Sequence, residues 1–193
     1  MSMPTYTLVC DRCDFRASSM KTWGIFEYQD TEGRYPCNRQ LGWCADCNDL
    51  VPMEDFSNPD SYAEHIEDRL HWLKSETYSA WQAFLNALSR RRRTRHQEWL
   101  VEAEAALRGL RNGQLRRGTE RCLKCGSQAV SSFDGCVDVR LSDDGMVFEG
   151  RNPTGYLHPG CGGEFVAEGS EMRFSMRFFT RVYSPEGYLL AEE

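Results

Sequence analysis

Four short ligand pairs, each with two intervening residues, constrain this chain more than any other feature of its sequence. Three are Cys-x-x-Cys and one is His-x-x-Cys; they are Cys10/Cys13, Cys44/Cys47, Cys122/Cys125 and His158/Cys161. Two ligands separated by two residues can reach one metal ion from a single tight turn, and tetrahedral zinc takes four sulfur or nitrogen ligands. The spacing therefore predicts two metal sites, each built from two such turns.

The intervals between these pairs repeat along the chain. Thirty residues lie between Cys13 and Cys44, and thirty-two lie between Cys125 and His158. The chain thus contains two copies of one frame, Cys-x2-Cys-x30-Cys-x2-Cys and Cys-x2-Cys-x32-His-x2-Cys. Each frame offers four protein ligands and leaves no position for a water molecule, so we expect structural rather than catalytic metal.

The residue after each pair is suited to a tight ligand turn. A turn that folds the backbone around an ion often needs positive φ at this position, and Gly, Asn and Asp tolerate it best. The residues found there are Asp14, Asn48, Gly126 and Gly162. All four therefore fit such a turn.

The Cys-x-x-Cys-Gly and His-Pro-Gly-Cys-Gly-Gly motifs, set in short β segments, resemble the zinc-ribbon family over about residues 8–50 and 120–165. The resemblance implies two structural zinc ions and two ligand sets. One set is Cys10, Cys13, Cys44 and Cys47, and the other is Cys122, Cys125, His158 and Cys161. Zinc ribbons serve transcription, translation, enzyme assembly and protein docking, so the family implies a fold and a metal but no single task.

Three alternatives to this assignment stay open. Four cysteines bind iron as well as zinc, and Cys136 could replace His158 in the second site, although its spacing argues against it. Disulfides are disfavoured because nine cysteines is an odd number and the first ten residues show no secretory signal. We expect a reducing, cytoplasmic location, with Cys37 and Cys136 as small buried apolar residues.

Residues 60–108 contain no Gly or Pro and are rich in Glu, Arg, Leu, Ala and Gln, which predicts helix. Apolar residues recur at helical spacing on both sides of residues 89–98, a stretch without an apolar side chain. Two interpretations are open: a helical hairpin that turns near residues 90–95, or one long or bent helix. Four successive arginines point to every side of a helix, so residues 90–93 cannot be buried.

These patterns predict an α+β fold in three parts. Residues 1–54 form an N-terminal zinc-ribbon-like module, residues 55–118 a helical linker region, and residues 119–193 a C-terminal zinc-ribbon-like module with a β-hairpin extension. We expect the hairpin to have a strand over residues 171–183, a type I turn over residues 184–187, and a return strand over residues 188–190.

Alternation along the first hairpin strand predicts its two faces. The core face contains Met172, Phe174, Met176 and Phe178. The other face mixes arginine with aromatic residues, a combination that also grips single-stranded nucleic acid; its members are Arg173, Arg177, Phe179, Arg181 and Tyr183.

Charge is spread unevenly. The whole chain has a formal net charge of −6 and a pI of about 5.3, whereas residues 86–125 carry eleven basic and four acidic side chains. A basic segment on an acidic chain can be the electrostatic footprint of a nucleic-acid site. The other interpretation is a solvated helix tip paired with acidic neighbours.

The motifs predict a protein that is not an enzyme. The sequence has no Gly-rich phosphate loop, Gly-x-Ser-x-Gly or His-Glu-x-x-His, and no apolar run near the ~20 residues that cross a bilayer. We expect a zinc-stabilised adaptor that binds another protein, without a membrane or small-molecule partner. The alternative is nucleic-acid binding through Arg90, Arg91, Arg92, Arg93, Arg95, Arg173, Arg177 and Arg181.

Overall fold

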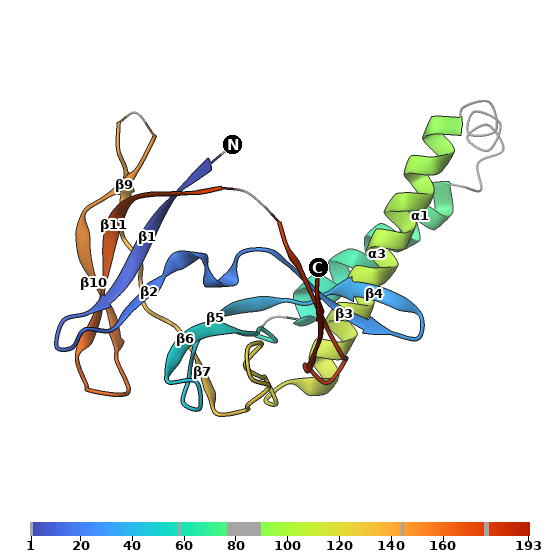
Figure 1. Ribbon diagram of the computed structural model, residues 1–193. Helices are drawn as coiled ribbons and strands as arrows, with labels where there is room; N and C mark the ends of the chain where they lie inside the picture. The colour runs from blue at the N-terminus through green and yellow to red at the C-terminus, as the bar shows by residue number, and fades with distance from the viewer. Residues whose placement is uncertain (1, 58, 77–89, 144, 176–177) are drawn as a thin grey trace.

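The computed structural model describes residues 2–57, 59–76, 90–143, 145–175 and 178–193 (Figure 1). Its helices and its mainly antiparallel sheets come from different stretches of the chain, so the expected α+β fold is confirmed. Figure 1 shows one sheet at one end of the molecule, the two helices at the other end, and further strands between them. In the described ranges, no helix combines the length and apolar character needed to span a bilayer.

The sheet farthest from the helices contains strands from both ends of the chain. Its order is β10–β11–β1–β2, with every neighbouring pair antiparallel. The strands are β1 (Ser2–Cys10), β2 (Arg16–Ser18), β10 (Arg151–Leu157) and β11 (Glu164–Ser175). Leu8, Phe165 and Ala167 are fully buried and pack with Trp43 of another sheet. Their alternate positions along β1 and β11 place them on one face.

A second sheet has the order β13–β12–β3–β4. Its strands are β3 (Ile25–Asp30), β4 (Gly33–Pro36), β12 (Thr180–Tyr183) and β13 (Leu189–Glu192), and the short helix η1 (Ser19–Thr22) leads into it. Strand β12 runs parallel to β3, whereas the other neighbours are antiparallel. Phe26, Tyr28 and Tyr183 form its buried core. Tyr183 Oη donates to the Leu123 carbonyl oxygen at 2.9 Å, which ties this sheet to the third ligand pair.

A third sheet has the order β6–β5–β7, and a separate two-stranded sheet follows it in the chain. The strands of the third sheet are β5 (Arg39–Cys44), β6 (Asp49–Glu54) and β7 (Val130–Ser132). The two-stranded sheet consists of β8 (Arg140–Leu141) and β9 (Phe148–Glu149). Gly42 lies in the central strand β5, where a Cβ atom would come within 2.7 Å of the Ser131 carbonyl oxygen. A side chain at this position would therefore force β5 and β7 apart.

Helices α1 (Pro59–Glu76) and α3 (Arg90–Arg116) lie side by side (Figure 1). Leu70 and Leu73 of α1 pack with Ala103, Leu107 and Leu110 of α3. These positions recur every three or four residues, so each helix buries one face against the other. The paired interpretation is confirmed and the single long helix is wrong, but the expected turn near residues 90–95 is also wrong, because α3 begins at Arg90. Residues 90–95 lie within α3, and the connecting residues 77–89 fall outside the described residues.

The expected strand over residues 171–183 is in fact two strands in different sheets. β11 ends at Ser175 and pairs with β1, whereas β12 begins at Thr180 and pairs with β3. Phe178, expected in the core, is 61% exposed, and Tyr183, expected on the outer face, is fully buried. Phe178 lies between the two strands, and Val182 and Tyr183 are both buried in the second sheet. A period-two pattern keeps its faces only along one continuous strand, so the expected alternation does not extend across this break.

The two outer segments of the chain share their sheets. β1 pairs with β11, β3 with β12 and β5 with β7, and each pair takes one strand from residues 1–54 and one from residues 119–193. The division of the chain at residues 54 and 118 stays a prediction. The hydrogen bonding does correct the expectation that each outer segment builds its own ribbon, because backbone groups are satisfied across the two segments.

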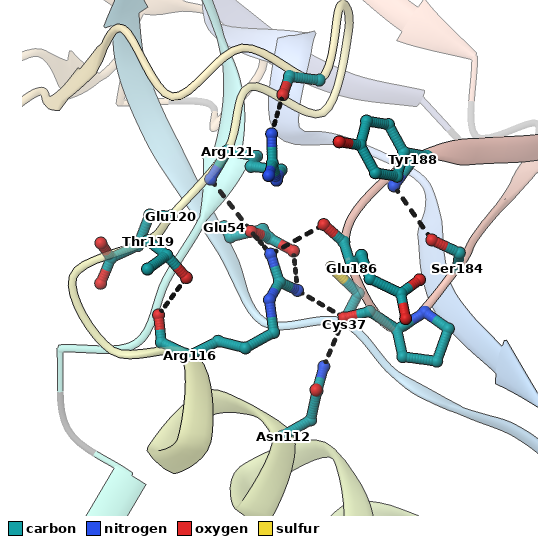
Figure 2. A network of polar contacts seen from close by, with 12 residues as sticks. Cys37, Glu54, Asn112, Arg116, Thr119, Glu120, Arg121, Ser184, Glu186 and Tyr188 are labelled. Carbon is teal, nitrogen blue, oxygen red and sulfur yellow. Dashed lines mark hydrogen bonds and ion pairs between the residues drawn. The ribbon is translucent and has the colours of Figure 1, made fainter.

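A buried ion pair joins α3 to the third sheet (Figure 2). Glu54 ends β6 and is 0% exposed, and its carboxylate accepts two hydrogen bonds from the Arg116 guanidinium, at 2.7 and 2.6 Å. Tyr28 Oη and the Arg121 backbone N–H also donate to this carboxylate, at 2.6 and 2.9 Å. The buried charge is therefore paired and fully hydrogen-bonded.

Arg116 also holds the turn between β12 and β13. Its Nη1 donates to the Pro185 carbonyl oxygen at 2.6 Å, and its Nη2 donates to the Glu186 carbonyl oxygen at 2.9 Å (Figure 2). A β-turn at the expected residues is confirmed, since the Gly187 N–H donates to the Ser184 carbonyl oxygen at 2.8 Å; its type I geometry stays a prediction. The C-terminal hairpin is thus fastened to the end of α3.

Candidate metal centres

The structure gathers the eight predicted ligands into two clusters. The outer cluster comprises Cys10, Cys13, His158 and Cys161, and the inner cluster comprises Cys44, Cys47, Cys122 and Cys125. Within each cluster, one ligand atom from every residue lies within 4.8 Å of the others. Each cluster can therefore hold one metal ion.

The grouping expected from the repeated frames is wrong. The first ligand pair meets the fourth, and the second meets the third. Antiparallel pairing is the cause. β1 ends at Cys10, opposite Phe165 near the start of β11, and β5 ends at Cys44, opposite Val130 at the start of β7. Each ladder brings two ligand turns to the same end.

The outer cluster has the spacing of a tetrahedral site. Cys161 Sγ lies 3.4 Å from Cys10 Sγ and 3.6 Å from Cys13 Sγ. His158 Nδ1 lies 3.4 Å from Cys13 Sγ and 3.2 Å from Cys161 Sγ. With zinc–sulfur bonds of about 2.3 Å, tetrahedral geometry separates two sulfurs by about 3.8 Å. These side chains fit one four-coordinate ion.

The inner cluster presents four sulfurs. Cys44 Sγ lies 3.7 Å from Cys125 Sγ, and Cys47 Sγ lies 3.9 Å from Cys122 Sγ. Backbone N–H groups within the turns donate to the sulfurs of Cys44 and Cys122 at 3.3 to 3.4 Å. Such donors favour the thiolate form that a metal ion requires. Cys44 and Cys122 are fully buried, whereas Cys125 is exposed.

Three of the four positions after the ligand pairs have the positive φ suited to a tight turn: Asn48 at 47°, Gly126 at 76° and Gly162 at 69°. Asp14 is not among the described residues with positive φ. There the chain returns to β2 through a hydrogen bond from the Cys10 N–H to the Phe15 carbonyl oxygen, at 3.1 Å. This wider turn needs no left-handed residue after Cys13.

His158 completes the outer cluster, whereas Cys136 is exposed and lies outside both clusters. His158 is 5% exposed, and its ring centroid lies 4.8 Å from that of Trp43 and 5.0 Å from those of Phe15 and Phe165. Nδ1 faces the cluster sulfurs, and Nε2 is buried without a hydrogen-bond partner in the described part of the chain. The three rings hold the imidazole with Nδ1 available to an ion.

The two cysteines outside the clusters differ in environment. Cys37 is 2% exposed, as expected, and burial raises the pKa of its thiol to about 12. It is therefore an unreactive thiol at neutral pH. Cys136 is exposed, contrary to expectation, because the segment between β7 and β8 lies at the surface, where the Cys136 backbone N–H donates to the Thr154 carbonyl oxygen.

The arginines predicted to bind nucleic acid occur in separate places. Arg95 on α3 is exposed. Arg181 is half-buried; its Nε donates to Glu192 at 2.5 Å, and its guanidinium carbon lies 4.6 Å from the Phe179 ring centroid. The side chains of the remaining six lie outside the described residues, and these are Arg90, Arg91, Arg92, Arg93, Arg173 and Arg177.

Two contacts in the structure could not be predicted from the sequence. Trp43 packs on His158 and directly precedes the ligand Cys44. An aromatic residue beside one ligand is only weak evidence that it contacts a ligand of another site. The partnership of Glu54 with Arg116 spans 62 positions. The sequence near Glu54 does not single it out, because two acidic residues, Glu54 and Asp55, follow the apolar residues 50–53.

Comparison with known protein families, curated proteins and solved structures finds no match for this chain. The two clusters alone are loosely consistent with zinc-ribbon-like modules, because each joins two ligand turns from antiparallel strands.

Proposed function

We propose that this protein is a non-catalytic adaptor, stabilised by two structural zinc ions, that binds another protein through the surface around β13. The donor sets support zinc, since four cysteines, or three cysteines and one histidine, with tetrahedral spacing are the usual ligands of structural zinc. Each cluster supplies four protein ligands, whereas catalytic zinc usually keeps one position for water. Each ion would staple together strands from both outer segments.

The single observation that supports protein binding is an exposed apolar run on an edge strand. Tyr188, Leu189 and Leu190 are consecutive and are 51%, 47% and 57% exposed. β13 lies at the edge of its sheet, so its outer backbone groups can pair with a further strand. A groove of about 320 Å³ lies beside it, lined in part by Val51 and Leu123. Exposed apolar residues around a groove are typical of a docking surface.

The inner cluster supports one wall of this groove. Asp49 follows the second ligand pair by two positions, and its carboxylate pairs with Lys21 at 2.5 Å and with Lys124 at 3.4 Å. Lys124 lies between the ligands Cys122 and Cys125. A metal ion in the inner cluster would hold both turns and hence the wall, so partner binding should require the ion.

A charged substitution on β13 is expected to remove partner binding without unfolding the protein. Leu190→Asp places a carboxylate at an exposed position, where stability changes by about 0.5 kcal/mol or less. Its desolvation in an apolar interface should lower partner affinity at least about tenfold. The measurement is capture by immobilised full-length protein from a nuclease-treated extract, followed by cross-linking and mass spectrometry.

The matched control is Val101→Asp, because Val101 is 66% exposed on α3 and lies fifteen positions before Arg116, the residue that holds the hairpin turn. The control should retain the same proteins as the wild type. If the Leu190→Asp variant captures the same proteins as the wild type, the proposed binding surface is wrong. A parallel capture from an untreated extract tests the nucleic-acid alternative. Nucleic acid that is recovered there, is lost steeply with salt, and is lost on replacing residues 90–93 by glutamate would support that alternative.

A further inference from the structure

The first turn of the inner cluster touches the histidine of the outer cluster. Trp43 directly precedes the inner ligand Cys44, and its ring meets the His158 ring edge to face, with 67° between the planes. Trp43 is 4% exposed and His158 is 5% exposed. Packed rings in this geometry attract each other beyond their burial. The position of Trp43 therefore limits how the His158 ring can turn.

A second contact comes from the other end of the same turn. Asn48 directly follows the inner ligand Cys47 and has a φ of 47°. A Cβ atom on Gly160 would lie 3.1 Å from His158 Nε2 and 3.7 Å from Asn48 Oδ1, so these two polar atoms face one small space. A histidine that binds metal through one nitrogen normally donates its other N–H to an acceptor. Asn48 Oδ1 faces the same space, where a bridging water molecule would let it accept this N–H.

The two sites are also nested in the chain. Cys13 and His158 are separated by 145 positions, and the loop closed by the inner cluster spans 75 positions. Once the inner cluster is closed, the path between the outer turns is only 31 positions from Cys13 to Cys44 and 33 from Cys125 to His158. Loop-closure entropy depends on the logarithm of loop length, so this shortening favours the outer site about threefold.

We infer that the inner cluster loads zinc first and that the loaded inner turn raises the zinc affinity of the outer cluster through Trp43 and Asn48. This inference rests on the proposed zinc binding. An ion held by Cys44 and Cys47 fixes the two residues that flank them, and these hold His158 with Nδ1 toward the outer sulfurs. Coupling between binding sites is reciprocal, so zinc in the outer cluster also tightens the inner one.

The test measures the zinc affinity of the outer cluster in the full-length protein by competition with a chromophoric chelator. The double variant Cys44→Ser/Cys47→Ser should weaken the outer site at least about threefold, from loop closure alone. Trp43→Ala keeps all eight ligands and should weaken it about fivefold, the range of one aromatic contact. Trp99→Ala, which removes a 40% exposed tryptophan from α3, is the control and should change neither affinity.

A second background separates the ring contact from general destabilisation. His158→Cys keeps four ligands but removes the imidazole, so Trp43→Ala should no longer weaken the outer site in this background. The coupling would be overturned if the outer site had the same zinc affinity in the wild type, the Cys44→Ser/Cys47→Ser variant and the Trp43→Ala variant. That result would not contradict zinc binding itself. A wild-type protein that takes up no zinc would overturn the proposed zinc binding instead.

Discussion

Zinc removal is expected to unfold the sheets that contain the two clusters. Structural zinc contributes on the order of 10–16 kcal/mol to small metal-stapled folds, whereas whole domains are stable by only about 5–15 kcal/mol. The outer cluster lies at the end of the first sheet and the inner cluster at the end of the third, so both of these sheets depend on them. Elemental analysis should find two zinc ions per chain, and a strong chelator should strongly reduce the β-sheet signal in circular dichroism.

The matched pair of variants for this experiment is Cys122→Ser and Cys136→Ser. Cys122 is a fully buried inner ligand, whereas Cys136 is exposed and lies outside both clusters. The first variant should bind at most one zinc ion and lose cooperative thermal unfolding, and the second should behave as wild type. An inner cluster that holds iron would show as a coloured protein with one zinc and one iron. Retention of the full sheet signal after complete zinc loss would contradict a structural role.

Loss of the Arg116 guanidinium is expected to destabilise the protein by about 3–5 kcal/mol, the cost of leaving a buried charge without its partner. Glu54 has a fully buried side chain and Arg116 is 15% exposed. Arg116→Met preserves much of the side-chain volume, but the Glu54 carboxylate then retains only two neutral donors, the Tyr28 hydroxyl and the Arg121 backbone N–H. The β12–β13 turn also loses its anchor. Urea unfolding followed by fluorescence measures the free energy of unfolding.

An exposed ion pair gives the comparison for this measurement. Arg111 and Glu67 are 3.3 Å apart with side chains 62% and 54% exposed, so Arg111→Met should cost about 1 kcal/mol or less. The double variant Glu54→Leu/Arg116→Met should be more stable than Arg116→Met alone, because no unpaired charge is left buried. Similar losses of unfolding free energy for Arg111→Met and Arg116→Met would show that the buried ion pair stabilises the protein no more than the exposed one.

Local patterns predicted the parts of the fold that depend on neighbouring residues. The two-residue spacing identified all eight members of the clusters, because a turn of four residues presents both of its ligands on one side. The helical period and the absence of Gly and Pro indicated the region that forms α1 and α3. The turn before β13 followed from Pro185 and Gly187, whose backbone preferences act within a few residues.

Expectations that depended on distant contacts were the ones that failed. Phe178 is exposed and Tyr183 is buried because the chain leaves the first sheet after β11 and enters the second at β12, with Phe178 between the two strands. The Glu54–Arg116 pair was missed because its partners belong to β6 and α3, and nothing near either residue indicates the other.

The sequence by itself determined which side chains can hold metal and where helices form, since both depend on spacing over a few residues. Only the tertiary structure decided which turns share a cluster. Four chemically similar turns can combine into two sites in three ways, and equal intervals cannot distinguish them. The pairing of β1 with β11 and of β5 with β7 makes the choice. Each cluster joins the turns that the β ladders bring to the same end, whatever their separation along the chain.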